Sequence, residues 1–351
     1  MIAVVPRSLV RSLVGWYRRN RRDLPWRRTR DPYRIWIAEV MLQQTTVRAV
    51  VPYYGRFLRR FPTLRALSRA PLSALLATWS GLGYYKRARN LRAAARLIAR
   101  RHKGRFPADP QAARALPGVG RYTAGAVLSI AYGQKEPVLD GNVARVLSRI
   151  ALVRQGTRTA AGRRELWALA QTLAEAAAAP GDLNQALMEL GATLCTPLDP
   201  GCPRCPVRNV CAARAAGIED SIPPRRTVRA PVTLRTAVAL VSRSGRLLMR
   251  RRAGTGLMDG LWEFPPLREG GAGGGPRLRS LGKVVTVRHS ITYRRLRVEV
   301  HRARLLSEPV GSDYRWVSPR TALRLPTSSL VSKILGRACA GAAADGAAGA
   351  V

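Results

Sequence analysis

Residues 116–124 read Leu-Pro-Gly-Val-Gly-Arg-Tyr-Thr-Ala and lie between two segments of helical pattern. Gly118 and Gly120 permit a tight turn and let backbone N–H groups approach a partner closely. The N-terminus of the helix that follows adds a partial positive charge, which suits a phosphate. Two glycines alone fit an ordinary corner between helices equally well, so the rest of the sequence has to decide between the two interpretations.

The charge of the whole chain favours the phosphate interpretation. Its 351 residues include 61 Lys and Arg but only 20 Asp and Glu, a net charge of +41. Such a surface attracts polyanions, and nucleic acid is the commonest of these. A genome rich in arginine codons would explain arginine in place of lysine, but not the shortage of acids. We therefore expect a protein that binds nucleic acid.

Two carboxylates stand in positions that suit catalysis. Asp140 lies at the expected start of a helix, within 138–147, Val-Leu-Asp-Gly-Asn-Val-Ala-Arg-Val-Leu, although capping alone would explain it. Glu39 is the one acid in the apolar helical segment 36–45, Trp-Ile-Ala-Glu-Val-Met-Leu-Gln-Gln-Thr, and could also be a solvated helix charge. Partial burial of Glu39 would favour the protonated acid and raise its pKa. One protonated and one ionised carboxylate are the pair that cleaves glycosidic bonds.

Four of the five cysteines are clustered, with the spacing Cys195-x6-Cys202-x2-Cys205-x5-Cys211. In a cytosolic chain, clustered cysteines indicate a metal site rather than disulfides. Four thiolates at this spacing can enclose a [4Fe–4S] cluster, and zinc is the alternative for any set of four cysteines. Spacing alone favours iron–sulfur only slightly. The fifth cysteine, Cys339, is expected to be a free thiol.

Several of these segments resemble one family of DNA repair enzymes. The string Leu-Pro-Gly-Val-Gly at 116–120 resembles the helix-hairpin-helix motif of DNA repair glycosylases. The Leu-Asp-Gly-Asn-Val that follows at 139–143 resembles the catalytic aspartate region of the endonuclease III superfamily. The segments 38–45 and 81–91, the latter Gly-Leu-Gly-Tyr-Tyr-Lys-Arg-Ala-Arg-Asn-Leu, are similar to those of MutY-type adenine DNA glycosylases. The cysteine loop also has the position of the iron–sulfur loop in these enzymes.

The resemblance implies a role for each matching residue. It makes Glu39 the general acid that protonates adenine, a poor leaving group without that proton, and Asp140 the carboxylate that stabilises the sugar. Tyr122 and Asn142 would support both acids through hydrogen bonds. The residues implied to contact DNA are Gln43, Gln44, Thr45, Leu82, Tyr84, Gly118, Val119, Gly120 and Thr292. The residues implied to bind a [4Fe–4S] cluster are Cys195, Cys202, Cys205 and Cys211.

The second half of the chain changes character after Gly217 and favours strands. Paired prolines near Ile222 indicate a linker, because they favour extended backbone. The segments 260–265, Gly-Leu-Trp-Glu-Phe-Pro, and 314–317, Tyr-Arg-Trp-Val, resemble the MutT-like domain of MutY enzymes. No acid-rich helix for magnesium follows, so we expect recognition rather than hydrolysis. Strands are expected at 232–241, 246–250, 283–287, 296–300 and 314–317, and a short helix near 319–323.

The loop that inspects oxidised guanine in this family departs from its usual pattern. The common Phe-Ser-His corresponds here to Ile291-Thr292-Tyr293. Thr292 keeps a hydroxyl, but the aromatic ring and the imidazole are replaced. The departure puts the strength of discrimination for oxidised guanine in doubt.

These observations predict a multidomain chain. We expect an all-α helix-hairpin-helix glycosylase domain with its iron–sulfur loop at 1–216, a linker at 217–231, an α+β MutT-like (Nudix-like) domain at 232–336, and a disordered tail at 337–351. The expected partner is double-stranded DNA with adenine opposite 8-oxoguanine or guanine, from which adenine is flipped and excised to leave an abasic site. Without an apolar run of about eighteen residues or a signal peptide, we expect a cytoplasmic monomer that does not contact membranes.

Two other functions stay open at this point. A bifunctional glycosylase–lyase for oxidised pyrimidines needs an amine to form a Schiff base with the sugar, and Tyr122 stands where such enzymes carry lysine. The second domain also argues against it. A non-enzymatic DNA-binding or redox-sensing iron–sulfur protein would not need both Glu39 and Asp140.

Overall fold

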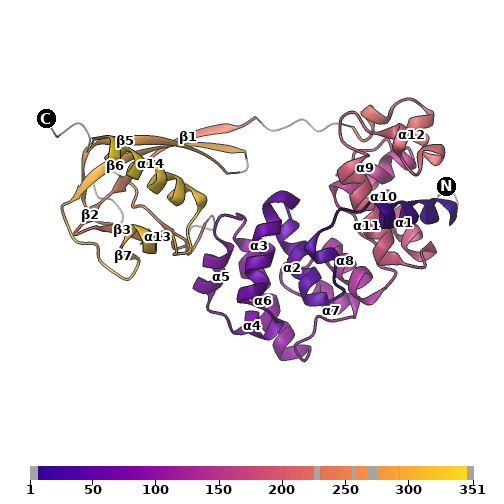
Figure 1. The fold of residues 1–351 in the computed structure, drawn as a ribbon, viewed down its shortest axis with the longest axis horizontal. Coiled ribbons are helices and arrows are strands. Elements are labelled where there is room, and N and C mark those ends of the chain that lie inside the picture. The colour runs from indigo at the N-terminus through magenta and orange to yellow at the C-terminus, as the bar shows by residue number, and fades with distance from the viewer. Residues whose placement is uncertain (1–6, 225–229, 255–257, 268–274, 292, 346–351) are drawn as a thin grey trace. The chain divides into compact units, whose positions relative to one another are not determined.

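The computed structural model describes residues 7–224, 230–254, 258–267, 275–291 and 293–345, with side chains up to Ala338. It divides into two compact units: residues 1–69 with 90–227, and residues 70–89 with 228–351. The first unit is built from helices, and every described strand belongs to the second (Figure 1). An all-α region followed by an α+β region confirms the predicted fold class.

Capping residues and prolines determine where several helices of the first unit begin. The Asp31 side chain accepts the N–H of Tyr33 at the start of α2, with Pro32 as its first residue. Asp109 and Pro110 repeat this arrangement at α7, so the same Asp-Pro pair in the sequence marks the start of both helices. The helices up to the cysteine loop and beyond it are α1 (Arg7–Asn20), α2 (Pro32–Leu42), α3 (Val47–Arg60), α4 (Leu64–Arg69), α5 (Leu72–Trp79), α6 (Lys86–Arg101), α7 (Pro110–Arg114), α8 (Arg121–Tyr132), α9 (Gly141–Ile150), α10 (Ala160–Ala176), α11 (Pro180–Thr193) and α12 (Ala212–Ala215). Short 3-10 turns lie at η1 (Pro25–Arg27), η2 (Cys202–Arg204), η3 (Arg208–Val210) and η4 (Glu219–Ser221).

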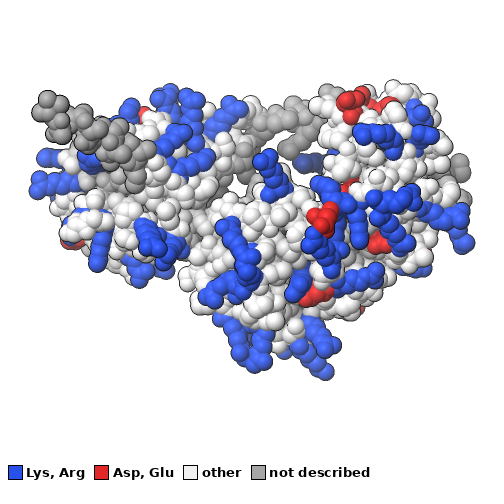
Figure 2. Space-filling model, in the orientation of Figure 1, with Lys and Arg blue, Asp and Glu red and all other residues white. Residues whose placement is uncertain are grey.

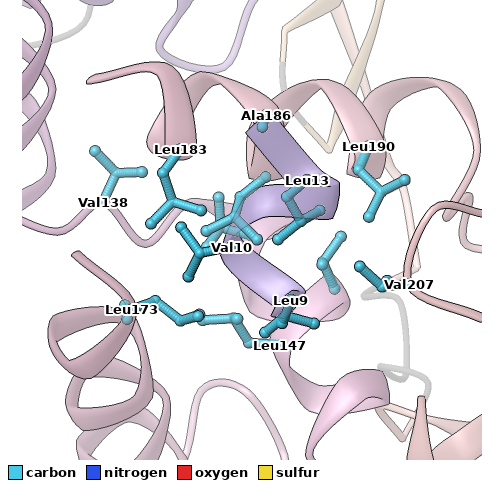
Figure 3. Close-up of a cluster of buried hydrophobic side chains, with 14 of the residues drawn as sticks. Leu9, Val10, Leu13, Val138, Leu147, Leu173, Leu183, Ala186, Leu190 and Val207 are labelled. Carbon is cyan, nitrogen blue, oxygen red and sulfur yellow. The ribbon is translucent and has the colours of Figure 1, made fainter. Parts of the chain in front are cut away.

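One apolar core packs the N-terminal helix α1 against α9, α10 and α11. Figure 3 shows Leu9, Val10 and Leu13 of α1 among side chains of α9, α10 and α11. Leu13 and Leu183 are fully buried there, and each such side chain contributes about 1.5–3 kcal/mol by leaving water. The position of α9, whose N-cap is Asp140, is therefore set by packing against three other helices.

The second unit contains two sheets. The first has the strand order β1-β6-β5, with β1 parallel and β5 antiparallel to the central β6. The second joins β2, β3 and β4, and β7 pairs with β3. The strands are β1 (Val232–Leu240), β2 (Ser242–Arg243), β3 (Arg246–Arg251), β4 (Trp262–Glu263), β5 (Leu278–Ile291), β6 (Arg294–Leu305) and β7 (Tyr314–Val317). All five expected strands are present, β5 and β6 are longer than expected, and the two-residue strands β2 and β4 were not predicted.

Two helices follow the last strand, and the second corrects an expectation. The short helix α13 (Pro319–Ala322) was predicted, whereas α14 (Ser329–Asp345) runs through much of the tail expected to be disordered from residue 337. That expectation is wrong as far as Asp345, and 346–351 lie outside the described residues. The helix forms because Val331, Ile334 and Leu335 are buried against the first sheet, and the alanines beyond them have the highest helix propensity.

Residues 70–89 belong to the second unit because their turn hydrogen-bonds within it. The Ser80 and Tyr85 hydroxyls both donate to the backbone carbonyl of Thr327, at 2.7 and 2.8 Å. Arg89 forms an ion pair with Asp259, with 3.4 Å between Nη2 and Oδ2. This compact unit thus includes the segment that carries Leu82 and Tyr84. In the described chain, no helix has the length and apolar character that crossing a membrane requires.

Candidate active site

A pocket of about 610 Å³ in the first unit is formed by α2, α8, α11 and the start of α9. Its walls bring together residues from distant parts of the sequence. The predicted site residues that line it are Glu39, Gln43, Gln44, Thr45, Tyr122, Asp140 and Asn142.

Glu39 is buried on α2, a helix whose other residues are almost all apolar, and only 5% of it is exposed. Burial raises the pKa of Glu39 to about 7, and the charge of Asp140 acts in the same direction. A hydrogen bond from Tyr122 and the charge of Arg27 oppose this increase. The carboxyl group therefore keeps a proton near neutral pH, where an exposed glutamate would have lost it.

Tyr122 lies in the first turn of α8 and donates its hydroxyl proton to Glu39 Oε2 at 2.8 Å. The same hydroxyl lies 3.2 Å from Met188 Sδ on α11, a pocket residue that no sequence motif marked. Burial, followed by the charges of Glu39 and Asp140, raises the pKa of Tyr122 well above its ordinary value. Tyr122 thus remains a neutral donor that orients the acid.

Asp140 is the N-cap of α9 and accepts the backbone N–H of Val143 at 2.7 Å. The Asn142 amide donates to its other oxygen at 3.3 Å. Burial raises the pKa of Asp140, whereas the N–H groups of Val143 and Asn142 and the charge of Arg145 oppose that increase. Asp140 is therefore held among donors, whereas Glu39 has a single one.

Helix α9 is fixed against α11 by a close approach of the two backbones. A Cβ atom on Gly191 would lie 2.7 Å from Asn142 Cβ, so only glycine fits there. Arg145 donates to the Asn142 side chain at 2.9 Å, to the Gly191 carbonyl at 2.6 Å and to the Cys195 carbonyl at 2.8 Å. Sequence reasoning missed this arginine. The spacing of three and four residues from Asn142 through Arg145 to Arg149, which puts them on one helix face, could have revealed it.

A third carboxylate, Glu189, lines the same pocket and was also missed. Glu189 on α11 is fully buried and accepts hydrogen bonds from Arg22 and Arg27, each with an Nη2–Oε2 distance of 2.7 Å. Burial opposes the ionisation of Glu189, but the hydrogen bonds from Arg22 and Arg27 outweigh it and hold the pKa at about 2. Glu189 is therefore an ionised, fully paired group.

The hairpin between α7 and α8 has the tight turn that the sequence predicted. Gly118 has φ 76°, in the left-handed region, and a Cβ there would lie 2.7 Å from Asn90 Cβ. Gly120 is the N-cap of α8, and a Cβ there would meet no atom within 4 Å, so its backbone is open to a partner. Val119 is buried and its N–H donates to the Leu116 carbonyl at 3.0 Å, so it anchors the hairpin from inside.

The other predicted DNA-contacting residues lie in the second unit. Leu82 is buried, whereas Tyr84 is 41% exposed and has φ 48°. The Arg87 guanidinium lies 5.2 Å from the centre of the Tyr84 ring. Thr292 lies outside the described residues.

The four clustered cysteines line one cavity after α11, together with Leu194, Val207 and Arg149. Arg149 is 2% exposed and donates to Cys195 Sγ at 3.3 Å and to the Thr196 carbonyl at 2.7 Å. Among the described residues, no three His, Cys, Asp or Glu side chains are grouped as a site for a single metal ion. Zinc bonds of about 2.3 Å would need the four sulfurs about 3.8 Å apart, whereas in a cubane each thiolate binds its own iron. Four thiols around one cavity are the donor set that a [4Fe–4S] cluster needs.

Comparison with known families finds two domains along the chain. Residues 37–172 match the family described as HhH-GPD superfamily base excision DNA repair protein, and residues 236–337 match the NUDIX domain. A solved structure of a thermostable thymine-DNA glycosylase superposes on 60% of this chain and 97% of its own, with a TM-score of 0.54 and 32% identity. Fold and pocket together define a base-excision DNA glycosylase with an added NUDIX domain.

Curated relatives narrow this class to one family. The adenine DNA glycosylase of Homo sapiens is 35% identical over 92% of this chain and 72% of its own length. That of Mus musculus is 34% identical over 92% of this chain and 76% of its own. The chain belongs to the adenine DNA glycosylases, as its sequence motifs predicted. It is a DNA repair enzyme that acts on the N-glycosyl bond of adenine.

Proposed function

We propose that this enzyme flips adenine that faces 8-oxoguanine or guanine out of duplex DNA and excises it in the pocket of the first unit. The observation that carries the proposal is the 2.8 Å hydrogen bond between Tyr122 and the buried Glu39, in a pocket that Asp140 also lines. A carboxyl group with a pKa near 7 suits the protonation of adenine at physiological pH. The NUDIX domain supports recognition of the opposite base.

The two acids divide the chemistry between them. Glu39 donates its proton to a ring nitrogen of adenine, which turns the base into a better leaving group. Asp140, whose N–H donors favour the carboxylate form against the effect of burial, stabilises the positive charge that develops on the sugar as the bond breaks. Water then completes the reaction and leaves an abasic site. Tyr122 and Asn142 position the two carboxylates and touch neither the base nor the sugar in this scheme.

The pocket supports a glycosylase without lyase activity. No lysine is among its described lining residues, and its two cations, Arg22 and Arg27, are both bound by Glu189. Guanidinium groups stay protonated and are poor nucleophiles. The sugar therefore meets no amine that could form an imine with it.

We infer that Cys195, Cys202, Cys205 and Cys211 hold a [4Fe–4S] cluster, which when bound would cross-link the loop after α11. Arg149 would keep its N–H group directed at the Cys195 thiolate. Anaerobically purified protein should contain iron and absorb broadly in the visible range. Stoichiometric zinc without iron would contradict the inference, and Cys202→Ser should destabilise the loop and weaken DNA binding.

The domains take separate tasks in this proposal. Residues 1–216 excise the base, 217–231 link the domains, and 232–336 inspect the base opposite adenine, with Thr292 in the inspecting loop. The enzyme acts as a monomer on double-stranded DNA. Tyr84, exposed on its turn, inserts into the base stack next to the flipped nucleotide, with Leu82 behind it.

One set of assays tests this function. Single-turnover excision is measured on duplexes with adenine opposite 8-oxoguanine, guanine or thymine, and with thymine opposite guanine. We expect strand breaks only after alkali, fastest with 8-oxoguanine or guanine opposite adenine, and little covalent complex after borohydride. Preference for the thymine–guanine mismatch would assign the base choice of the similar thymine-DNA glycosylase instead. Efficient borohydride trapping at the rate of base release would favour a lyase.

A further inference from the structure

A second concavity, away from the excision pocket, lies where the first turns of α8 and α10 meet. It is an open depression of about 760 Å³, lined mainly by Arg121, Arg158, Arg163, Arg164 and Trp167. We call these five residues the arginine pocket. None of them is among the described lining residues of the excision pocket.

The lining of the arginine pocket is strongly positive. Four guanidinium groups line it and no carboxylate does. In the described part of the chain, none of the four side chains forms an ion pair or a hydrogen bond with another residue. The acids nearby point elsewhere: Glu136 pairs with Arg114 at 2.7 Å, and Glu165 on α10 is exposed but does not line the depression. Like charges held this close repel one another, so an anion would stabilise the arrangement.

The arginine pocket is also organised in advance. The Arg121 guanidinium lies 4.0 Å from the centre of the Trp167 ring, and only 8% of Trp167 is exposed. Burial, followed by the charge of Arg114, lowers the pKa of Arg121, and the charge of Glu136 partly opposes this effect. Stacking on an aromatic face fixes the plane of the guanidinium and leaves its edge free for bidentate hydrogen bonds to a phosphate.

The position of the pocket identifies the anion. Arg121 directly follows Gly120, the open N-cap of the hairpin, so the pocket continues the surface that the hairpin offers to DNA. The N-termini of α8 and α10 both start at its edge, and each adds a partial positive charge. The chain has 61 Lys and Arg against 20 Asp and Glu, and Figure 2 shows many more basic than acidic side chains on the face that it draws. Isolated basic residues are therefore common, but four around one stacked tryptophan are a specific arrangement.

We propose that the arginine pocket binds the phosphate backbone of duplex DNA just beyond the nucleotides held by the hairpin, and so extends the footprint of the enzyme. The inference rests on the hairpin being the DNA grip, as proposed above. Guanidinium contacts to phosphates carry no sequence information. The pocket thus increases affinity and residence on DNA regardless of sequence. An acidic segment of a partner protein is the competing occupant.

The test compares two variants with the same change in charge. The double variant Arg163→Gln/Arg164→Gln removes half of the pocket's cations, and Arg100→Gln/Arg101→Gln removes two exposed cations at the end of α6. Affinity for an undamaged duplex is measured by fluorescence anisotropy across a salt series. Each phosphate contact contributes about 0.9 to the slope of log affinity against log salt. We expect the pocket variant to lower this slope by about 1 to 2, and the control to change it little.

A second arm locates the contact. Duplexes that carry one adenine opposite 8-oxoguanine set the register of the protein. Shortening them one base pair at a time on the side that the pocket contacts should weaken binding by the unmodified protein more than binding by the pocket variant, whereas shortening on the other side should affect both equally. Equal slopes for the pocket and control variants would overturn the proposal. So would a loss confined to an acidic peptide such as poly-glutamate, which would assign the pocket to a protein partner. Adenine excision by the unmodified protein is measured in parallel, so failure of the proposed function can be told apart from failure of the pocket.

Discussion

Two walls of the excision pocket carry buried glutamates in opposite states. On the α2 wall, Glu39 has one donor, Tyr122, and its pKa is raised to about 7. On the α11 wall, Glu189 has two guanidinium partners, Arg22 and Arg27, and its pKa is about 2. Both side chains are almost completely removed from solvent.

The difference shows that burial alone does not determine whether a carboxyl group keeps its proton near neutral pH. Burial opposes ionisation at both residues, and the number of cations within hydrogen-bonding distance decides the outcome. Glu39 keeps its proton, whereas Glu189 neutralises Arg22 and Arg27. Without Glu189, the charges of these arginines would lie uncompensated next to the proton donor.

Glu39→Gln should nearly abolish excision. An amide keeps the shape of the side chain but has no acidic proton, and general acid catalysis contributes about 100- to 10,000-fold. The single-turnover rate on an adenine duplex should fall by that order, while anisotropy reports nearly unchanged DNA affinity. Glu175→Gln, an exposed glutamate on α10, is the matched control and should keep the full rate. A near-normal rate in Glu39→Gln would remove this residue from the mechanism.

Glu189→Gln should mainly cost stability. It leaves Arg22 and Arg27 without their counter-charge, and breaking a buried ion pair costs about 3–5 kcal/mol. Urea denaturation measures the free energy of unfolding. Asp182→Asn on the same helix, whose partner Arg18 is 60% exposed, should cost no more than about 1 kcal/mol.

The stability difference at Glu189 should also depend on pH in a defined direction. The pKa of Glu189 in the folded protein is lowered from 4.5 to about 2, so its contribution is complete above the unfolded value and disappears as the pH falls through the folded one. The gap between the unmodified protein and Glu189→Gln should therefore shrink as the solution is acidified from about 4.5 towards 2. A gap that stays constant over this range would contradict the ionised state.

The pH dependence of the excision rate should report the ionisation of Glu39 on the α2 wall. Because the pKa of Glu39 is raised from 4.5 to about 7, the protonated acid dominates below that value and is lost above it. We expect the single-turnover rate to fall about tenfold per pH unit on the alkaline side. A rate that stays flat well above neutrality would mean that another group supplies the proton.

Tyr122→Phe should have the smallest effect. It should shift the alkaline limb of the pH profile, the range in which the excision rate falls as Glu39 loses its proton. The Tyr122 hydrogen bond lowers the pKa of Glu39, so its removal should shift the midpoint of the limb upward, by up to about one unit for a bond worth about 1.4 kcal/mol. Tyr132→Phe, whose hydroxyl donates to the Phe106 carbonyl outside the pocket, should leave the midpoint in place. A downward shift would contradict the direction of this contact.

Local signals in the sequence were enough for much of the fold and for the α2 wall. Asp31 and Asp109, each followed by proline, are local signals for the start of a helix. The two glycines of the hairpin indicate its tight turn. Glu39 stood out because it is a lone acid in an apolar helix, and the family resemblance supplied its partner Tyr122. These features are encoded within a few residues of one another or within a recognisable motif.

The α11 wall could not be predicted because its partners are far apart in the sequence. Arg22 and Glu189 are separated by 167 positions, and nothing in the local pattern of either one indicates the other. The prediction of a disordered tail differs from the structure for another reason. The Ala and Gly content of the tail favoured disorder, but Val331, Ile334 and Leu335 anchor the helix by packing into the core. Tertiary packing decided both cases, and a composition or spacing argument does not include it.

The two glycines at positions 120 and 191 should drift differently over generations. Around Gly191 the Asn142 backbone and Cβ fill the space that any side chain would need, so every amino-acid replacement there introduces a clash that no rotamer can relieve. Around Gly120 the protein itself leaves room for a Cβ. A population selected only for folding would thus keep position 191 and diversify position 120. Selection for repair would fix both, and sequencing the two populations would separate the demands of the fold from those of the DNA.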